Sequence, residues 1–118
     1  MNDVTKHDWG HELTIASTND YSTKILEFTG PGSKTNFSFN VKKEKTWFVN
    51  TGHFKLRWID TDTGQLFETV LQEGQTHHVP PLMPCCLEAM SADSSITESS
   101  NGDYDKDTFI VLPSKNVG

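Results

Sequence analysis

The chain has 118 residues, a formal charge of −6 at neutral pH and a hydrophobic content of 34%. That length suffices for one domain with a real core, and the acidic charge without any basic block argues against a nucleic-acid-binding domain. No apolar run approaches the roughly 18 residues of a membrane span, and Asp3, Lys6 and Asp8 interrupt any signal-peptide pattern. We therefore expect a soluble, cytoplasmic protein with no nucleic-acid or membrane partner.

The first third of the chain predicts two strands after an irregular start. Residues 1–11 hold Trp9 but show no regular pattern, so we expect an N-terminal arm there. Residues 12–15 predict a short strand, and the alternation over residues 21–29 predicts a longer one. A glycine- and proline-rich break follows at residues 30–33.

The most informative stretch begins at Phe37. Residues 37–42 alternate strictly, which is typical of a strand with two unlike faces: Phe37, Phe39 and Val41 on one side, and Ser38, Asn40 and Lys42 on the other. A charged turn follows at residues 43–44, and a second apolar run covers residues 47–49.

The rest of the chain consists of short apolar runs separated by turn residues. Residues 53–59 form the cleanest alternating segment. Further strands are predicted at residues 65–71, 76–79, 85–90, 95–99 and 108–112. Short strands about ten residues apart, with no helical period, indicate one all-β sandwich or barrel.

The order of these landmarks resembles a known family, the small cupins related to the C-terminal domain of type II mannose-6-phosphate isomerases. The matching features run along almost the whole chain: Trp9-Gly10, Gly30-Pro31-Gly32, Trp47-Phe48-Val49 with Gly52, Gly74 to Pro80, and Gly102 to Val111. The resemblance implies a single cupin-type jelly-roll barrel (a double-stranded β-helix) over residues 1–118. Residues 1–11 would be its arm and residues 113–118 a loose tail.

The positions that hold the metal in such cupins are all substituted. The resemblance implies two histidines on the first motif strand, and these positions fall on Asn40 and Lys42. The glutamate position falls on Lys45, a glutamine position on Ser38, and the histidine of the second motif on Cys85. A charged lysine cannot coordinate a metal, so we expect no metal and no other cofactor.

A pocket without metal remains chemically plausible. Lys42 and Lys45 could supply the positive charge that a metal supplies elsewhere, with hydrogen bonds from Ser38 and Asn40. Cys85 and one histidine of the pair 77–78 complete the predicted site. We take His77 as the histidine that faces the barrel. We expect it to bind a small polar or anionic molecule, sugar-like or carboxylate, without catalysis. The plain alternative is that residues 42–45 form a solvated turn.

An enzymatic role stays open as the alternative function. It would be a carbohydrate isomerase or epimerase, either metal-independent or using a non-standard His/Cys site. Cys85 and Cys86 are adjacent, so they are expected on opposite faces of a strand and not in a disulfide with each other. A zinc or copper site could form from one of these cysteines and His77 or His78. Its third ligand would be His53 or Glu88.

The two interpretations of residues 37–42 disagree about which face is buried. Hydrophobicity alone turns Phe37, Phe39 and Val41 inward, whereas the cupin resemblance turns Ser38, Asn40 and Lys42 inward. In the second case the apolar side chains need cover from outside, because large apolar side chains on an exposed strand form an association patch. We therefore expect a homodimer.

Overall fold

The computed structural model describes residues 3–102 and 107–113, and within these ranges the chain forms eleven strands and no helix. Their bounds are β1 (Asp3–His7), β2 (Gly10–Ser17), β3 (Ser22–Phe28), β4 (Phe37–Asn40), β5 (Lys45–Thr51), β6 (His53–Ile59), β7 (Leu66–Gln72), β8 (Thr76–Val79), β9 (Cys85–Ala89), β10 (Ser94–Ser100) and β11 (Thr108–Leu112). The predicted all-β class is confirmed. No described helix is long and apolar enough to cross a membrane.

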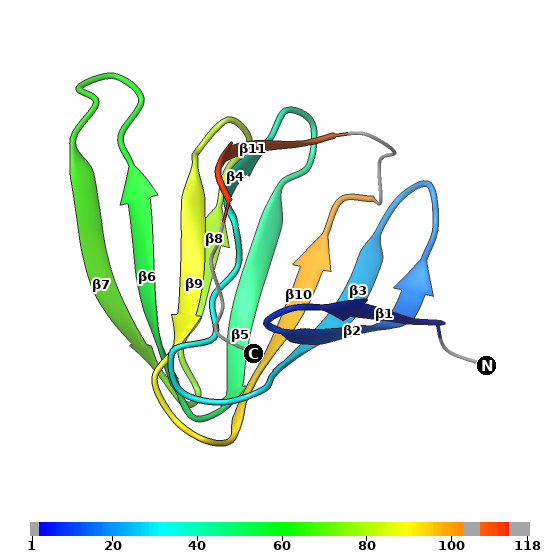
Figure 1. Ribbon diagram of the computed structural model, residues 1–118. Coiled ribbons are helices and arrows are strands. Elements are labelled where there is room, and N and C mark those ends of the chain that lie inside the picture. The colour runs from blue at the N-terminus through cyan, green and yellow to red at the C-terminus, as the bar shows by residue number, and fades with distance from the viewer. Residues whose placement is uncertain (1–2, 103–106, 114–118) are drawn as a thin grey trace.

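The strands form two sheets that face each other (Figure 1). Sheet A has six strands in the order β1-β2-β3-β10-β5-β8, and sheet B has five in the order β11-β4-β9-β6-β7. All pairings between neighbouring strands are antiparallel. Antiparallel sheets packed face to face bury one side of each strand, which explains the period-two patterns in the sequence.

The hydrophobic core lies between the sheets. Phe54 and Leu56 on β6 and Leu87 on β9 have no exposed surface, and Val49 and Ile96 oppose them from sheet A. Trp9, Leu26, Trp47, Cys85 and Leu87 belong to the core and also border a cavity. Apolar packing therefore fills part of the space between the sheets, and polar side chains occupy the rest.

The tight turn between β5 and β6 depends on a glycine. Gly52 has φ of 75°, a conformation that side chains with a Cβ rarely adopt. A Cβ there would also collide with the Asp93 carbonyl oxygen and the Ser94 hydroxyl. Gly52 thus allows β5 in sheet A to pass directly to β6 in sheet B.

The structure differs from the sequence prediction at the N-terminus and at the end of β4. Part of the expected arm, residues 1–11, is strand β1, which pairs with β2 with Val4 opposite Leu13. All five β1 residues are exposed, so this edge strand has no buried face to create an alternating pattern. Strand β4 ends at Asn40 instead of continuing to Lys42.

Candidate functional site

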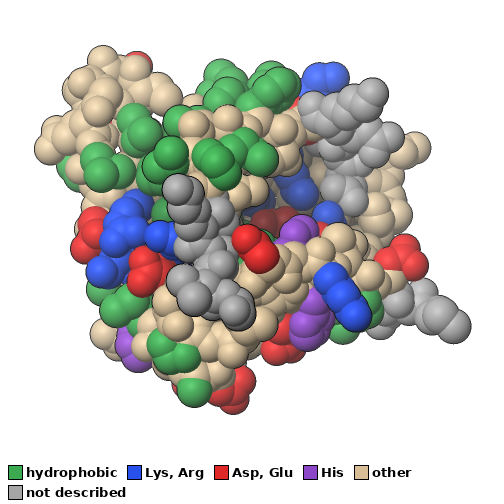
Figure 2. All heavy atoms as spheres, viewed as in Figure 1, with side chains coloured by type: hydrophobic (Ala, Val, Ile, Leu, Met, Phe, Trp, Pro, Cys, Tyr) green, Lys and Arg blue, Asp and Glu red, His purple; other side chains and the backbone are tan. Residues whose placement is uncertain are grey.

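A cavity of about 230 Å³ opens between the two sheets. Figure 2 shows a hollow in the middle of one face, with charged side chains inside it. Sheet A and the turn before β5 contribute Glu12, Lys24, Lys43, Lys45, Trp47 and Glu98, and sheet B contributes Ser38, Asn40, Cys85, Leu87 and Thr108. We call this cavity the barrel pocket.

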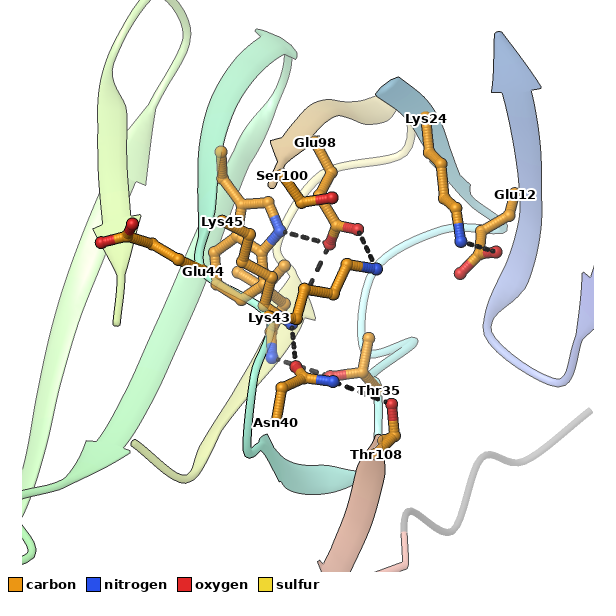
Figure 3. Close-up of polar contacts among 12 residues, drawn as sticks. Glu12, Lys24, Thr35, Asn40, Lys43, Glu44, Lys45, Glu98, Ser100 and Thr108 are labelled. Carbon is orange, nitrogen blue, oxygen red and sulfur yellow. Dashed lines mark hydrogen bonds and ion pairs between the residues drawn. The ribbon is translucent and has the colours of Figure 1, made fainter. Parts of the chain in front are cut away.

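Glu98 forms the centre of an ion network at the pocket wall (Figure 3). Its carboxylate lies 3.4 Å from Lys43 Nζ and 4.0 Å from Lys45 Nζ, and it accepts a 2.9 Å hydrogen bond from Trp47 Nε1. Burial by itself raises the pKa of Glu98. The charges of Lys45 and Lys43, together with the indole hydrogen bond, outweigh burial and hold the pKa below its usual value. The carboxylate is therefore ionised at neutral pH.

Asn40 links this network to sheet B. Lys45 Nζ donates to Asn40 Oδ1 at 3.2 Å, and Asn40 Nδ2 donates to Thr108 Oγ1 at 2.9 Å. The Lys45 ammonium also lies 5.0 Å from the centre of the Trp47 ring, within the range of a cation–π contact. These contacts fix the direction of the lysine, so its positive charge has a defined place in the pocket.

A second ion pair lines the pocket on the side of β2 and β3. Lys24 Nζ lies 3.7 Å from Glu12 Oε2, and His7 Nε2 lies 3.5 Å from Glu12 Oε1. The His7 ring stacks on Trp9, with centroids 4.6 Å apart and planes inclined by 9°. The hairpin of β1 and β2 thus brings an aromatic surface and the Glu12 carboxylate to the pocket, and β3 brings the Lys24 ammonium group.

The turn after β4 determines which lysine enters the pocket. The Asp107 carboxylate accepts hydrogen bonds from the backbone N–H groups of Val41, Lys42 and Lys43, at 3.0 to 3.2 Å. This turn breaks the period-two alternation, so Lys43 lines the pocket and Lys42 is exposed. The position expected for Lys42 is thereby corrected. Sequence reasoning also missed Glu98, although an isolated glutamate at an inward position of β10 was a usable signal.

His77 also lies outside the barrel pocket. It shares the inward face of β8 with the buried Val79, as expected for one histidine of the pair, but its ring lies beside Trp58 with centroids 6.0 Å apart. It lines a separate depression on the side of β7. Burial and the neighbouring His78 lower the pKa of His77. His77 lies outside the barrel pocket because of the register between β5 and β8. This register pairs His77, which lies on the edge strand beyond β5, with Trp47.

The cysteines lie on opposite faces of β9, as expected from their adjacency. Cys85 lines the barrel pocket, Cys86 lies opposite Arg57 on β6, and neither forms a disulfide. Burial raises the pKa of Cys85 to about 11 and also raises that of Cys86. Cys85 is a neutral thiol at neutral pH, and a neutral thiol is a poor nucleophile and a poor metal ligand.

The structure resolves the conflict over the two faces of β4. Ser38 and Asn40 line the pocket, while Phe39 stacks on Phe109 of β11 with ring centroids 5.5 Å apart. Val41 is 42% exposed. The polar face of the strand therefore points inward, as the family resemblance implied.

The residues of the barrel pocket do not fit a divalent metal. Two lysine ammonium groups lie within 4.0 Å of Glu98, the buried carboxylate there, and would repel a cation. Among the described residues no group of three or more histidines, cysteines, aspartates and glutamates is close enough to hold a metal ion. Cys85 and His77, one pairing of the His/Cys site considered from the sequence, line different cavities.

Solved structures provide the comparison with known proteins. One is CapF in complex with the inhibitor 3-isopropenyl-tropolone, with a TM-score of 0.83 and 15% identity over 95% of this chain and 34% of that chain. Another is the capsular polysaccharide assembling protein CapF from Staphylococcus aureus, with a TM-score of 0.82 and 15% identity over 95% of this chain and 34% of that chain.

Oxalate decarboxylase from Bacillus subtilis also matches, with a TM-score of 0.82 and 13% identity over 93% of this chain and 30% of that chain. The chain thus spans about a third of the length of these proteins. No family model and no curated protein sequence matches it. Both neighbours are cupins, and the chain has the cupin fold, a jelly-roll barrel of two antiparallel sheets.

Proposed function

We propose that the barrel pocket binds a small polar or anionic molecule without a metal, and that the protein acts by binding and not by catalysis. The observation that carries this proposal is the network of Lys43, Lys45 and Glu98. Lys45 in this network occupies a position at which the family resemblance implies a metal ligand. Asn40 and Cys85, which line the same pocket, occupy two more such positions. Fixed ammonium groups there can receive an oxygen of a ligand directly.

The size and lining of the pocket support a ligand of monosaccharide size. A volume of about 230 Å³ corresponds to roughly eight water molecules at about 30 Å³ each. Lysine ammonium groups donate hydrogen bonds, and the carboxylates of Glu12 and Glu98 accept them. Trp9 and Trp47 add apolar ring surface. A hydroxyl-rich molecule uses all three kinds of contact.

The ionisation of the pocket supports binding over acid–base or nucleophilic chemistry. A general base works best with a pKa near the working pH, whereas the pKa of Glu98 lies below its usual value. The Cys85 thiol has the opposite shift, to about 11, and is not a ready nucleophile. Turnover of a bound sugar would instead support the alternative, a carbohydrate isomerase or epimerase.

Isothermal titration calorimetry with neighbouring lysine variants tests this proposal. The titrants are sugars and carboxylates of monosaccharide size, and the protein is purified without a metal-affinity tag and analysed for metal content. Lys43→Ala and Lys45→Ala should each weaken binding at least about tenfold, since each removes a charged hydrogen-bond donor. Lys42→Ala is the matched control, because Lys42 is exposed beside Lys43. Equal effects of all three variants, or one bound metal per chain that the ligand requires, would refute the proposal.

We also propose that the protein is a cytoplasmic homodimer of the mannose-6-phosphate isomerase-like group of cupins. The support for the homodimer is an exposed apolar strip on β11 and just after β4. Its residues, each more than 40% exposed, are Val41, Phe109, Ile110, Val111 and Leu112. Figure 2 shows hydrophobic side chains gathered over the region where Figure 1 places β4 and β11. Strand β11 is also an edge of sheet B, which can pair with a second edge.

Light scattering after gel filtration tests the dimer. The wild-type chain should have twice the monomer mass, and Ile110→Lys should shift it toward the monomer, because a charge on an apolar edge opposes association. Val4→Lys, on the exposed edge strand β1, is the control and should leave the mass unchanged. A monomeric wild-type chain at all concentrations would refute the dimer.

A further inference from the structure

Strand β11 differs from the other strands at the sheet edges, because it has no charged or titratable side chain. In the described part of the chain the edge strands are β1 and β8 in sheet A and β7 and β11 in sheet B. Charged side chains and a short length oppose the pairing of an edge with another chain. Strand β1 carries Asp3 and Lys6, β7 carries Glu68, and β8 has only four residues, two of them histidines. Strand β11 is exposed along its whole length, so it is the edge best suited to pair with a second copy of itself.

The same strand is connected to the barrel pocket at its N-terminal end. Thr108 Oγ1 accepts the 2.9 Å hydrogen bond of Asn40 Nδ2, and Asn40 Oδ1 accepts a 3.2 Å hydrogen bond from Lys45 Nζ (Figure 3). The carboxylate of Asp107, directly before β11, accepts a 3.0 Å hydrogen bond from the backbone N–H of Lys43. Residues 107 and 108 therefore help to position both lysines that pair with Glu98 in the pocket wall.

Strands β4 and β11 form a two-stranded unit at the end of sheet B. Among the described residues, the pairing of β4 with β9 consists of one residue pair, Ser38 with Cys85. Just beyond it, the backbone N–H of Leu82 donates a 2.6 Å hydrogen bond to the Asn40 carbonyl oxygen. Strand β11 has β4 as its neighbour and lies at the edge of the sheet. Two strands by themselves are marginally stable, and a strand paired on one side opens locally more easily than one paired on both.

From the uncharged edge and its contacts with the pocket we infer that pairing of β11 with β11 of a second copy promotes ligand binding in the barrel pocket. Pairing places β11 inside a continuous sheet, and this favours the conformation in which Asp107 and Thr108 position the two lysines. Antiparallel pairing of a strand with itself is symmetric, as a twofold dimer requires. The inference rests on the proposed binding function and the proposed homodimer, and it specifies how the second copy regulates the pocket.

Dilution of the wild-type protein tests the inference without any substitution. Gluconate and glucose 6-phosphate are the probes, and their binding is followed by tryptophan fluorescence, since Trp9 and Trp47 line the pocket. Analytical ultracentrifugation gives the dimer dissociation constant with and without each probe. We expect the monomer to bind at least about tenfold more weakly than the dimer, as when about a tenth of monomers have the binding-competent conformation. Because linkage is reciprocal, saturation with the probe should lower the dimer dissociation constant by about tenfold for each occupied pocket.

A substitution in the edge strand gives an independent test at any protein concentration. Val111 is 51% exposed and does not line the pocket, so Val111→Lys should give a monomer with the weaker probe affinity of the diluted wild-type protein. Leu66→Lys is the matched control, because Leu66 is 57% exposed on β7, the opposite edge of the same sheet. This control should leave the mass and the probe affinity unchanged.

The possible outcomes separate the inference from the proposals on which it rests. Equal probe affinities of monomer and dimer would overturn the inference and leave both the binding function and the homodimer standing. A wild-type chain that is monomeric at every concentration and still binds a probe would overturn the homodimer and the inference, but not the binding function. No binding of either probe would overturn the binding function for these ligands, and the inference with it.

Discussion

Replacing Glu98 by glutamine should destabilise the protein, because the change removes a buried charge and leaves its partners in place. The glutamine side chain has nearly the same volume and its amide oxygen can still accept the 2.9 Å hydrogen bond of Trp47 Nε1. The loss is therefore electrostatic. Lys43 and Lys45, whose side chains are 10% and 16% exposed, would keep their charges without the carboxylate between them.

Removing one partner of a buried ion pair costs about 3–5 kcal/mol. The two lysines border a pocket that water can enter, and Lys45 retains its hydrogen bond to Asn40. We therefore expect the lower end of that range, about 3 kcal/mol. For a domain of this size that loss lowers the melting temperature by about 12 °C. A typical stability of about 5–15 kcal/mol allows the variant to remain folded.

The effect should depend on pH in a direction that the pKa shift determines. The pKa of Glu98 is lower in the folded protein than its ordinary value of 4.5. A carboxyl group with a depressed pKa stabilises the folded state above its unfolded pKa, and this contribution is lost as the pH falls through the folded pKa. The stability difference between wild type and Glu98→Gln should therefore be constant above about pH 5 and shrink below pH 4.5.

Urea denaturation followed by tryptophan fluorescence, between pH 3 and pH 8, measures this difference. Glu44→Gln is the control, since Glu44 is an exposed glutamate paired with His78, and exposed pairs contribute about 0–1 kcal/mol. A Glu98→Gln protein as stable as Glu44→Gln at neutral pH would refute the reasoning. So would a difference that grows on acidification.

Three further predictions follow from single contacts. Asp107→Ala removes the acceptor of three backbone N–H groups and should lower the free energy of unfolding, measured by urea denaturation, by about 2 kcal/mol. It should also weaken ligand binding, because the turn that Asp107 holds positions Lys43. An unchanged ligand affinity would contradict this positioning role. Cys85 should react slowly with iodoacetamide at pH 8 in the folded protein and rapidly in guanidinium, as mass spectrometry would show, because burial raises its pKa to about 11. Gly52→Ala should destabilise the protein by clearly more than Gly64→Ala in the same denaturation assay. Both residues have positive φ, but only at Gly52 does a Cβ collide with neighbouring atoms.

The strand pattern is where sequence and structure agree most closely. Residues 53–59, 76–79 and 108–112 are strands with the predicted bounds. Local alternation carries this information because a strand between a core and solvent repeats every two residues. Strand β1 lacked the signal, since its edge position leaves every side chain exposed and any sequence of polar residues can occupy it.

The candidate site could be predicted only in part. Ser38, Asn40, Lys45 and Cys85 line one pocket, as the landmarks implied. Lys42 and His77 do not line it. The turn that is hydrogen-bonded to Asp107 leaves Lys42 exposed, and the strand register places His77 beside Trp58. Both effects involve partners distant in the sequence, which no local pattern reports.

The sequence by itself determined the all-β class, most strand positions and the substitution of the expected metal ligands. These are properties of residue type and local spacing. Only the tertiary structure decided that Lys43 Nζ and the Glu98 carboxylate, which are 55 positions apart in the chain, lie 3.4 Å from each other. It also decided that the polar face of β4 points inward. Packing between two sheets joins residues that are remote along the chain, so the charge of the pocket is a property of the fold and not of any one segment.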